Sequence, residues 1–149
     1  MSTFTSLSTH ITFSTKRRNP FIVPDLEARL LPYLGGIVRQ LGGTLLVSNA
    51  VADHVHLLAD FPPTIAISEA VGKIKGNSSK WIHETFSERS SFAWQRGFGA
   101  FGVSRSNIPS VARYIEAQKE HHRTVRFEEE FVRLLRRHGI DFEERYLWE

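Results

Sequence analysis

Two histidines separated by one residue, His54 and His56, are the residues whose types and spacing point most directly to chemistry in this chain of 149 residues. They lie in a run that predicts a β-strand, and side chains two positions apart on a strand project from the same face. Two imidazoles side by side form a chelating pair for a metal ion. Two histidines can also simply line a half-exposed strand, so the spacing alone leaves both interpretations open.

A tyrosine and a glutamine farther along the chain can supply other groups of such a site. Tyr114 and Gln118 are four residues apart in a segment with helical spacing, so the phenol and the carboxamide lie on one helix face. On its own, such a pair is usually a packing tyrosine and a solvent-exposed glutamine. His121 and His122 follow, and they can help to orient the phenol or interact with the helix dipole.

The composition restricts the class of protein. The chain has no cysteine, which excludes disulfides, thiolate metal sites and cysteine nucleophiles, so any metal must be bound by histidine, carboxylate or amide groups. Hydrophobic residues make up 41% and charged residues 23%, which is typical of a folded domain. The apolar runs are too short for a membrane span and the first residues lack a signal-peptide pattern, so we expect a soluble, cytoplasmic protein.

The charge of the chain is compatible with a nucleic-acid partner but does not require one. Lysine and arginine exceed aspartate and glutamate by three, at 19 against 16. Seven basic residues are candidates for contacts with a DNA backbone: Lys16, Arg17, Arg18, Lys73, Lys75, Lys80 and Arg96. For each of them, an ordinary solvent-exposed side chain is a competing interpretation.

The elements that must position these residues follow from hydrophobic periodicity and turn residues. Strands are expected at residues 7–13, 44–51 and 54–61, with a strand pair at 94–103; helices are expected at 24–41, 65–86, 107–122 and 127–138. This order predicts an α+β, ferredoxin-like (split βαβ) sandwich, in which an antiparallel sheet has helices on one face and additional C-terminal helices follow. The other sheet face would be free for function. One domain is expected to span residues 1–149.

The chain resembles the HUH-superfamily single-tyrosine transposases of the smallest insertion sequences, a family that includes those associated with repetitive extragenic palindromes (REP). The resemblance covers nearly the whole chain and is carried by residues 10–18, 53–58, 94–101 and 114–118, with His121 and His122 after them. The family usually has asparagine where this chain has Ala117, a departure that does not affect the ligand set.

The resemblance implies a DNA transposase that cleaves and rejoins single-stranded DNA, with hairpin ends expected in the substrate. It implies that Tyr114 is the nucleophile, which forms a covalent 5′-phosphotyrosine, and that His54, His56 and Gln118 bind Mg²⁺ or Mn²⁺. It also implies a homodimer in which the tyrosine helix completes the partner's site in trans. Residues 104–107 form a short connection across which that helix can be exchanged.

Three alternatives share features of this sequence. A replication initiator or relaxase has the same His pair and tyrosine, but is commonly fused to other domains. A domesticated transposase that processes host palindromic repeats would retain the same site. A non-catalytic module that binds single-stranded nucleic acid on the same sandwich would use its sheet for base stacking, and would need neither Tyr114 nor a metal.

Overall fold

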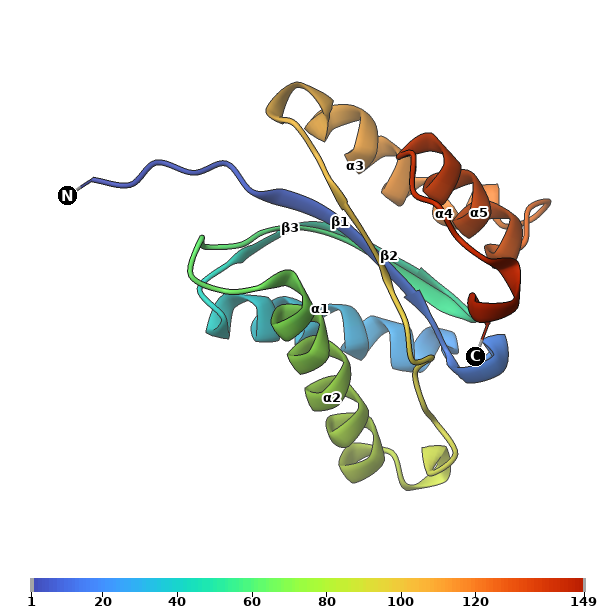
Figure 1. Cartoon of the computed structure of the whole chain (residues 1–149). Coiled ribbons are helices and arrows are strands. Elements are labelled where there is room, and N and C mark those ends of the chain that lie inside the picture. The colour runs from blue at the N-terminus through green and yellow to red at the C-terminus, as the bar shows by residue number, and fades with distance from the viewer. Residues whose placement is uncertain (1, 149) are drawn as a thin grey trace.

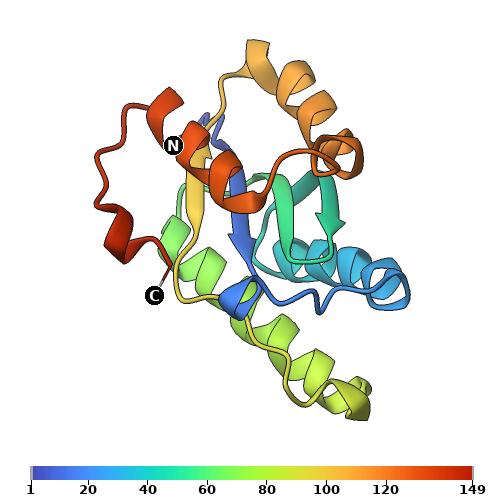
Figure 2. The same cartoon turned by 90° about the vertical axis from the view of Figure 1, so that its right-hand side faces the viewer.

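A four-stranded antiparallel sheet separates two layers of helices in the computed structural model, which describes residues 2–148 (Figure 1, Figure 2). The strands are β1 (Ser8–Ser14), β2 (Thr44–Val51), β3 (His54–Asp60) and β4 (Gly99–Gly102), arranged in the order β2-β3-β1-β4. Helices α1 (Pro24–Gln40) and α2 (Ile67–Thr85) lie on one face, and α3 (Ile108–Glu116), α4 (Gln118–His121) and α5 (Phe127–Arg137) lie on the other. This is the expected ferredoxin-like α+β sandwich, so the prediction of the fold class is confirmed.

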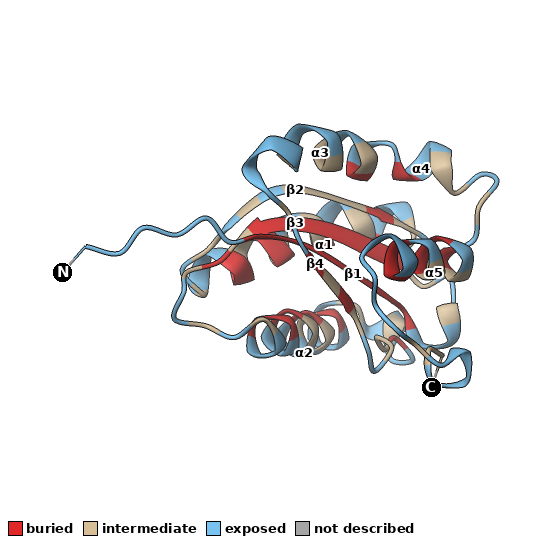
Figure 3. Ribbon diagram, turned by 45° about the horizontal axis from the view of Figure 1, so that its top comes forward, coloured by how far each residue is buried: buried red, intermediate tan, exposed pale blue. Residues whose placement is uncertain are grey.

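Alternation along the two central strands gives the sheet one apolar face and one polar face. Ile11 of β1 and Val55 of β3 point into the core beneath the sheet, where α1 and α2 pack. Their neighbours Thr12 and His56 point to the opposite face and lie across from each other in the antiparallel register. Because helices cover both faces, every residue of β1 is buried (Figure 3).

Helix α1 illustrates how local sequence determines an element. Pro24 occupies its first turn, where a missing backbone N–H costs nothing. The large apolar side chains that α1 buries recur at helical spacing: Leu26, Leu30, Leu34, Ile37 and Val38. The chain leaves the helix through Gly42, whose φ of +85° is readily adopted only by glycine.

The polar sheet face is not free, contrary to the expectation from the sequence. Helix α5 packs over it with the apolar residues Phe127, Phe131, Leu134 and Leu135. Gly99 of β4 permits this close approach, since a Cβ there would lie 2.8 Å from Cε2 of Phe131. The C-terminal helices therefore cover the polar sheet face, on which the candidate site lies.

Two expectations about individual elements are also corrected. Residues 94–103 contain one strand, β4 (Gly99–Gly102), which pairs with β1, while Trp94 makes only an isolated bridge to Thr15. The two halves of this segment therefore both follow β1 rather than pairing with each other. The helix expected at 107–122 divides at Ala117 into α3 and α4, although the hydrogen bond from the N–H of His121 to the carbonyl of Ala117 continues the helical direction.

Within residues 2–148, no helix combines the length and the hydrophobicity needed to cross a membrane.

Candidate active site

The four residues expected to carry the chemistry lie together on the polar face of the sheet. His54 and His56 project from β3 with their ring centroids 5.2 Å apart. Oε1 of Gln118 lies 3.4 Å from Nε2 of His54, although 64 residues separate the two in the chain. The ring of Tyr114 lies 5.8 Å from that of His56, centroid to centroid. The predicted grouping of these residues is therefore present in the structure, whereas their roles stay predictions.

Side chains from the sheet layer tie the tyrosine helix in place. The last carbonyls of a helix have no partner within the helix itself. Here Nδ2 of Asn49 on β2 donates to the carbonyl oxygens of Ile115 and Glu116, at 2.9 and 3.2 Å. Lys119 adds a bond from Nζ to Oδ1 of Asn49 at 2.9 Å. These contacts fix the end of α3 over β2 and β3, which places Tyr114 and Gln118 above the histidines.

The centre of the site is Glu130 of α5, a residue that the sequence interpretation missed. Its side chain is 1% exposed, and its Oε1 faces three imidazole nitrogens. The Nε2 atoms of His56, His122 and His54 lie 2.9, 3.1 and 3.4 Å from this oxygen. The position of Glu130 could have indicated its importance, because it falls three residues after Phe127 and directly before Phe131, on the apolar stripe of α5. A carboxylate buried there must have polar or charged partners.

The second oxygen of Glu130 contacts the tyrosine. The Tyr114 hydroxyl donates a hydrogen bond to Oε2, and Nε2 of Gln118 donates to the same atom at 2.9 Å. Burial, reinforced by the negative charge of Glu130, raises the pKa of Tyr114. Burial alone would raise the pKa of Glu130 as well, but the imidazoles of His122, His54 and His56 around its carboxylate hold this pKa well below its usual range. The phenol is therefore neutral and the carboxylate charged in this arrangement.

The histidines differ in their tendency to bind a proton. Burial lowers the pKa of His56 to about 4 and that of His10, whose Nε2 lies 2.8 Å from Nδ1 of His56, to about 3. Burial would also lower the pKa of His54, but the hydrogen bond to Asp53 and the nearby carboxylate of Glu130 raise it. Nδ1 of His54 lies 2.7 Å from Oδ1 of Asp53, which orients the ring in the way that outer partners orient metal-binding histidines.

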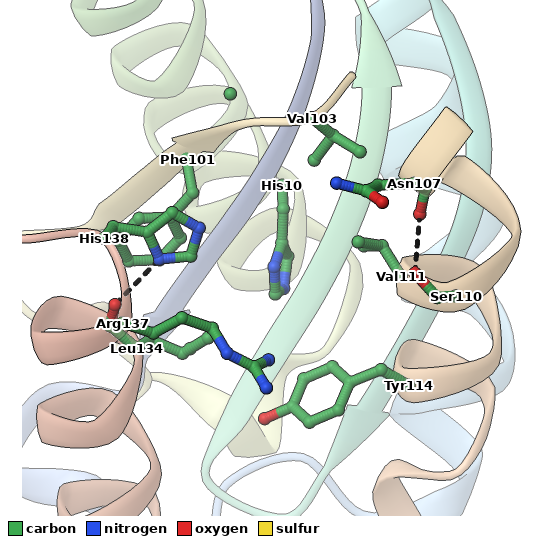
Figure 4. Close-up of a pocket in the computed structure, with 11 residues that line it drawn as sticks. His10, Phe101, Val103, Asn107, Ser110, Val111, Tyr114, Leu134, Arg137 and His138 are labelled. Atoms are coloured by element: carbon green, nitrogen blue, oxygen red, sulfur yellow. Dashed lines mark hydrogen bonds between the residues drawn. The ribbon is translucent and has the colours of Figure 1, made fainter. Parts of the chain in front are cut away.

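Tyr114 lies between two cavities that both carry positive charge. One has a volume of about 480 Å³ and is lined by His10, Phe101 and Arg137 among others (Figure 4). The other has a volume of about 230 Å³ and contains Arg133 as well as Arg137. In Figure 4 the guanidinium group of Arg137 and the hydroxyl of Tyr114 point toward one another. Such a place suits an anionic phosphate group, because guanidinium binds phosphate well.

The predicted DNA contacts fall into two groups, of which one lines a cavity of about 610 Å³ that we call the basic cleft. Its lining includes Lys16, Arg17, Arg18, Trp94, Arg96 and Trp148. A further cavity of about 690 Å³ runs from Arg17 and Arg18 to Asp53 and His122. The basic cleft therefore continues toward the histidines.

The other group lies on α2, in the layer beneath the sheet. Lys73 and Lys80 pair with glutamates of their own helix, Glu69 at 3.3 Å and Glu84 at 4.0 Å, and are well exposed. Nζ of Lys75 donates to the carbonyl oxygens of residues 95, 96 and 97, at 2.5, 3.1 and 2.9 Å. Lys75 thus holds the loop that presents Arg96 to the basic cleft. Contact of these lysines with DNA stays a prediction.

Comparison of the sequence with known proteins identifies the family. Residues 3–118 match the family described as "Transposase IS200 like". The transposase for insertion sequence element IS200 from Salmonella typhimurium is 31% identical over 121 residues, which cover 74% of this chain and 76% of that protein. The ISDra2 transposase TnpA from Deinococcus radiodurans is 25% identical over 119 residues, which cover 76% of this chain and 85% of that protein.

Solved structures share the fold. A crystal structure of a candidate transposase from Deinococcus radiodurans superimposes with a TM-score of 0.66 at 24% identity, over 79% of this chain and 95% of that one. A REP-associated tyrosine transposase bound to a REP hairpin superimposes with a TM-score of 0.63 at 14% identity, over 84% of this chain and 76% of that one. Fold and family together define a DNA transposase. The chain belongs to the IS200-like transposase family, as the resemblance predicted.

Proposed function

We propose that this transposase cleaves and rejoins single-stranded DNA through a covalent bond between Tyr114 and a 5′-phosphate, with a divalent metal at the His pair. The observation that carries the proposal is the convergence of Tyr114 and Gln118 on His54 and His56 at one buried place. A module that only binds nucleic acid has no need of a phenol beside two histidines. The convergence therefore favours the enzyme over the non-catalytic alternative.

In the proposed reaction, the phenolic oxygen of Tyr114 attacks the phosphorus of a phosphodiester. A bond forms between this oxygen and phosphorus, the bond from phosphorus to the 3′-oxygen breaks, and the 3′-oxygen takes up a proton and leaves as a hydroxyl. The proton that the phenol loses faces Oε2 of Glu130, which already accepts its hydrogen bond. Rejoining is the same exchange in reverse with another 3′-hydroxyl, so it needs no ATP.

A cation beside Tyr114 would favour loss of its proton. A tyrosine must lose its proton to become a good nucleophile, yet burial and Glu130 raise the pKa of Tyr114. When bound, a divalent cation supplies the positive charge that neutralises phosphate oxygens and offsets this carboxylate. His54 and His56 fit such an ion, because their buried Nε2 atoms face the same oxygen of Glu130.

Two points about the metal come from the resemblance and from general chemistry. Gln118, the third ligand that the resemblance implies, has its Oε1 3.4 Å from Nε2 of His54, which is compatible with that role. Mg²⁺ or Mn²⁺ is the expected ion. Imidazole ligands favour Mn²⁺, whereas cellular availability favours Mg²⁺.

The basic cleft and its continuation toward His122 are the proposed path of the DNA. Arg17 and Arg18 line both parts of this path and supply charge for phosphate contacts. Trp148, with Cζ of Arg18 5.1 Å from its ring centroid, offers a surface for an unpaired base. The REP-associated tyrosine transposase that shares the fold is bound to a REP hairpin, which supports single-stranded DNA with hairpin ends as the substrate of this chain.

The assembly and the compartment stay predictions. In the single chain, Tyr114 lies beside its own His pair. A domain swap through residues 104–107 would preserve the same contacts and change only which chain supplies them, so the expected homodimer with sites completed in trans is compatible with this geometry. The cytoplasm is the expected compartment. A mobile and a domesticated transposase would share the site.

A panel of labelled single-stranded hairpin oligonucleotides, incubated with the protein and Mn²⁺, tests the proposed function. We expect a protein–DNA adduct on a denaturing gel that contains the fragment with the 5′-phosphate and releases the fragment with the 3′-hydroxyl. Specific binding of a hairpin without any adduct, in the presence of Mn²⁺, would contradict the proposal and favour the binding module.

A further inference from the structure

Glu130 and His122 reach into the site from a part of the chain that the family match does not include. The match ends at residue 118, whereas His122 follows α4 and Glu130 lies on α5. Their side chains are nonetheless 8% and 1% exposed, and they lie against the His pair. A charged carboxylate that is buried to this extent requires a positive partner.

Outer contacts of two histidines determine where their inner lone pairs lie. Nδ1 of His54 faces the carboxylate of Asp53, and Nδ1 of His122 lies 2.5 Å from the carbonyl oxygen of Val125. A carboxylate and a carbonyl only accept hydrogen bonds, so each Nδ1 carries the hydrogen. In the neutral ring, Nε2 then has a lone pair available for a metal ion.

These lone pairs are directed at the same place as a carboxylate oxygen. Nε2 of His122 lies 3.1 Å from Oε1 of Glu130, but without the angles of a hydrogen bond, and it has no other hydrogen-bond partner in residues 2–148. Nitrogen lone pairs and an anionic oxygen repel one another unless a proton or a metal ion lies between them. Three imidazole nitrogens around one carboxylate oxygen therefore form the donor set of a cation site.

The dimensions of the cluster also fit a metal ion. One ligand atom from each of His54, His56, His122 and Glu130 lies within 4.8 Å of all the others. Two ligands that are each about 2.1 Å from a metal lie roughly 3.0 to 3.4 Å apart at octahedral or tetrahedral angles. The distances from the three Nε2 atoms to Oε1 run from 2.9 to 3.4 Å, so small adjustments would accommodate the ion.

We propose that Glu130 and His122 are metal ligands of this chain, which join His54 and His56 in a site of three imidazoles and one carboxylate. The inference rests on the proposed function, because it adds ligands to the metal which that function requires. Gln118, whose Oε1 keeps the ligand role that the resemblance implies, also donates from Nε2 to Oε2 of Glu130 and so orients the carboxylate. The segment after residue 118 thus supplies half of these four ligands.

Mn²⁺ binding to the full chain without DNA, followed by the electron paramagnetic resonance signal of free Mn²⁺, tests this ligand set. Glu130→Gln preserves the size of the side chain and removes its charge, and His122→Ala removes the most exposed of the four ligands. Each variant is expected to raise the dissociation constant at least about tenfold. The matched control is Glu129→Gln, at an exposed position of the same helix, which is expected to leave the constant unchanged.

The outcomes separate this inference from the proposed function. Wild-type binding by both Glu130→Gln and His122→Ala, together with loss of binding in His54→Ala, would overturn the inference and leave the metal site at the His pair standing. Absence of Mn²⁺ binding by the wild-type chain would overturn both. If circular dichroism shows that Glu130→Gln does not fold, the constant of His122→Ala alone decides.

Discussion

The hydroxyl of Tyr114 donates a hydrogen bond to Oε2 of Glu130, so the proposed nucleophile and the carboxylate at the centre of the histidines are in direct contact. The two residues come from different helices, α3 and α5. Since Oε1 of the same carboxylate faces three imidazoles, any change of charge among these histidines alters the electrostatic potential at the phenol. Nucleophile and proposed metal site are therefore electrostatically one unit.

The first prediction concerns the nucleophile. Tyr114→Phe is expected to slow formation of the covalent adduct at least about a thousandfold and to leave hairpin binding nearly unchanged, because only the hydroxyl is lost. Adduct formation is measured on denaturing gels and binding by fluorescence anisotropy. Tyr146→Phe is the matched control, since Tyr146 is 55% exposed and outside the site. An adduct that persists in Tyr114→Phe would assign the nucleophile to another residue.

The second prediction concerns the metal. EDTA is expected to stop cleavage, and His56→Ala is expected to do the same even with excess Mn²⁺, because it removes half of the chelating pair. Hairpin binding should survive both changes at low salt, since phosphate contacts supply most of the affinity. Cleavage and binding are measured on the same oligonucleotide. Full cleavage in EDTA would eliminate the metal from the proposed function.

Local periodicity was sufficient to predict most of the fold. The apolar runs at residues 44–51 and 54–61 predict two strands, and helical spacing in residues 24–41 predicts a helix. The structure's β2, β3 and α1 follow these bounds closely. Periodicity does not say which element packs on which. The prediction of a strand pair at 94–103 was wrong for this reason. Both halves of this segment pair along β1 and not with each other, and the local sequence does not contain this information.

The site was predictable where neighbours in sequence are neighbours in space. His54 and His56 share a strand face, and Tyr114 and Gln118 are one helical turn apart. Glu130 was missed because its role depends on α5 lying across the sheet, a tertiary contact that no local pattern encodes. Its place on the apolar stripe of α5 was the one available signal, and two adjacent glutamates, the half-buried Glu128 and the exposed Glu129, obscured it.

The third prediction distinguishes the two groups of basic residues. Arg17→Ala is expected to weaken hairpin binding and to reduce the slope of log affinity against log salt by about 1, because it removes one phosphate contact from the basic cleft. Lys73→Ala, which removes the same charge from the α2 layer, serves as the comparison and is expected to have the smaller effect. Equal slopes in Arg17→Ala and wild type would rule out the basic cleft as the path of the backbone.

The fourth prediction tests the assembly. A mixed dimer of a Tyr114→Phe chain and a His56→Ala chain contains one fully intact site if the tyrosine helix is exchanged, so cleavage is expected to return. With sites built within each chain, every site retains one defect. Orthogonal affinity tags isolate the mixed species, and each homodimer is the negative control. A verified heterodimer without cleavage would reject the exchange, and a monomer by light scattering would reject the dimer.

The last prediction concerns the pH dependence of stability and depends on Lys75. Burial lowers its pKa to about 8 in the folded chain, whereas an unfolded lysine titrates near 10.5. Below pH 8 Lys75 is protonated in both the folded and the unfolded chain, so burial of its charge lowers the free energy of unfolding by its full amount. Between these pKa values the unfolded chain binds a proton that the folded chain does not, so the free energy of unfolding rises with pH.

Urea denaturation of wild type and Lys75→Met at pH 7.5, 8.5 and 9.5 measures this contribution. Wild type is expected to gain stability relative to Lys75→Met across this range, by no more than about 1 kcal/mol, because part of the ammonium group remains in solvent. Tyr114, whose raised pKa acts in the opposite direction above about pH 10, is present in both proteins and cancels in the difference. Parallel pH profiles for the two proteins would show that the ammonium of Lys75 titrates normally, and that its bonds to the loop at residues 95–97 hold the charge without cost.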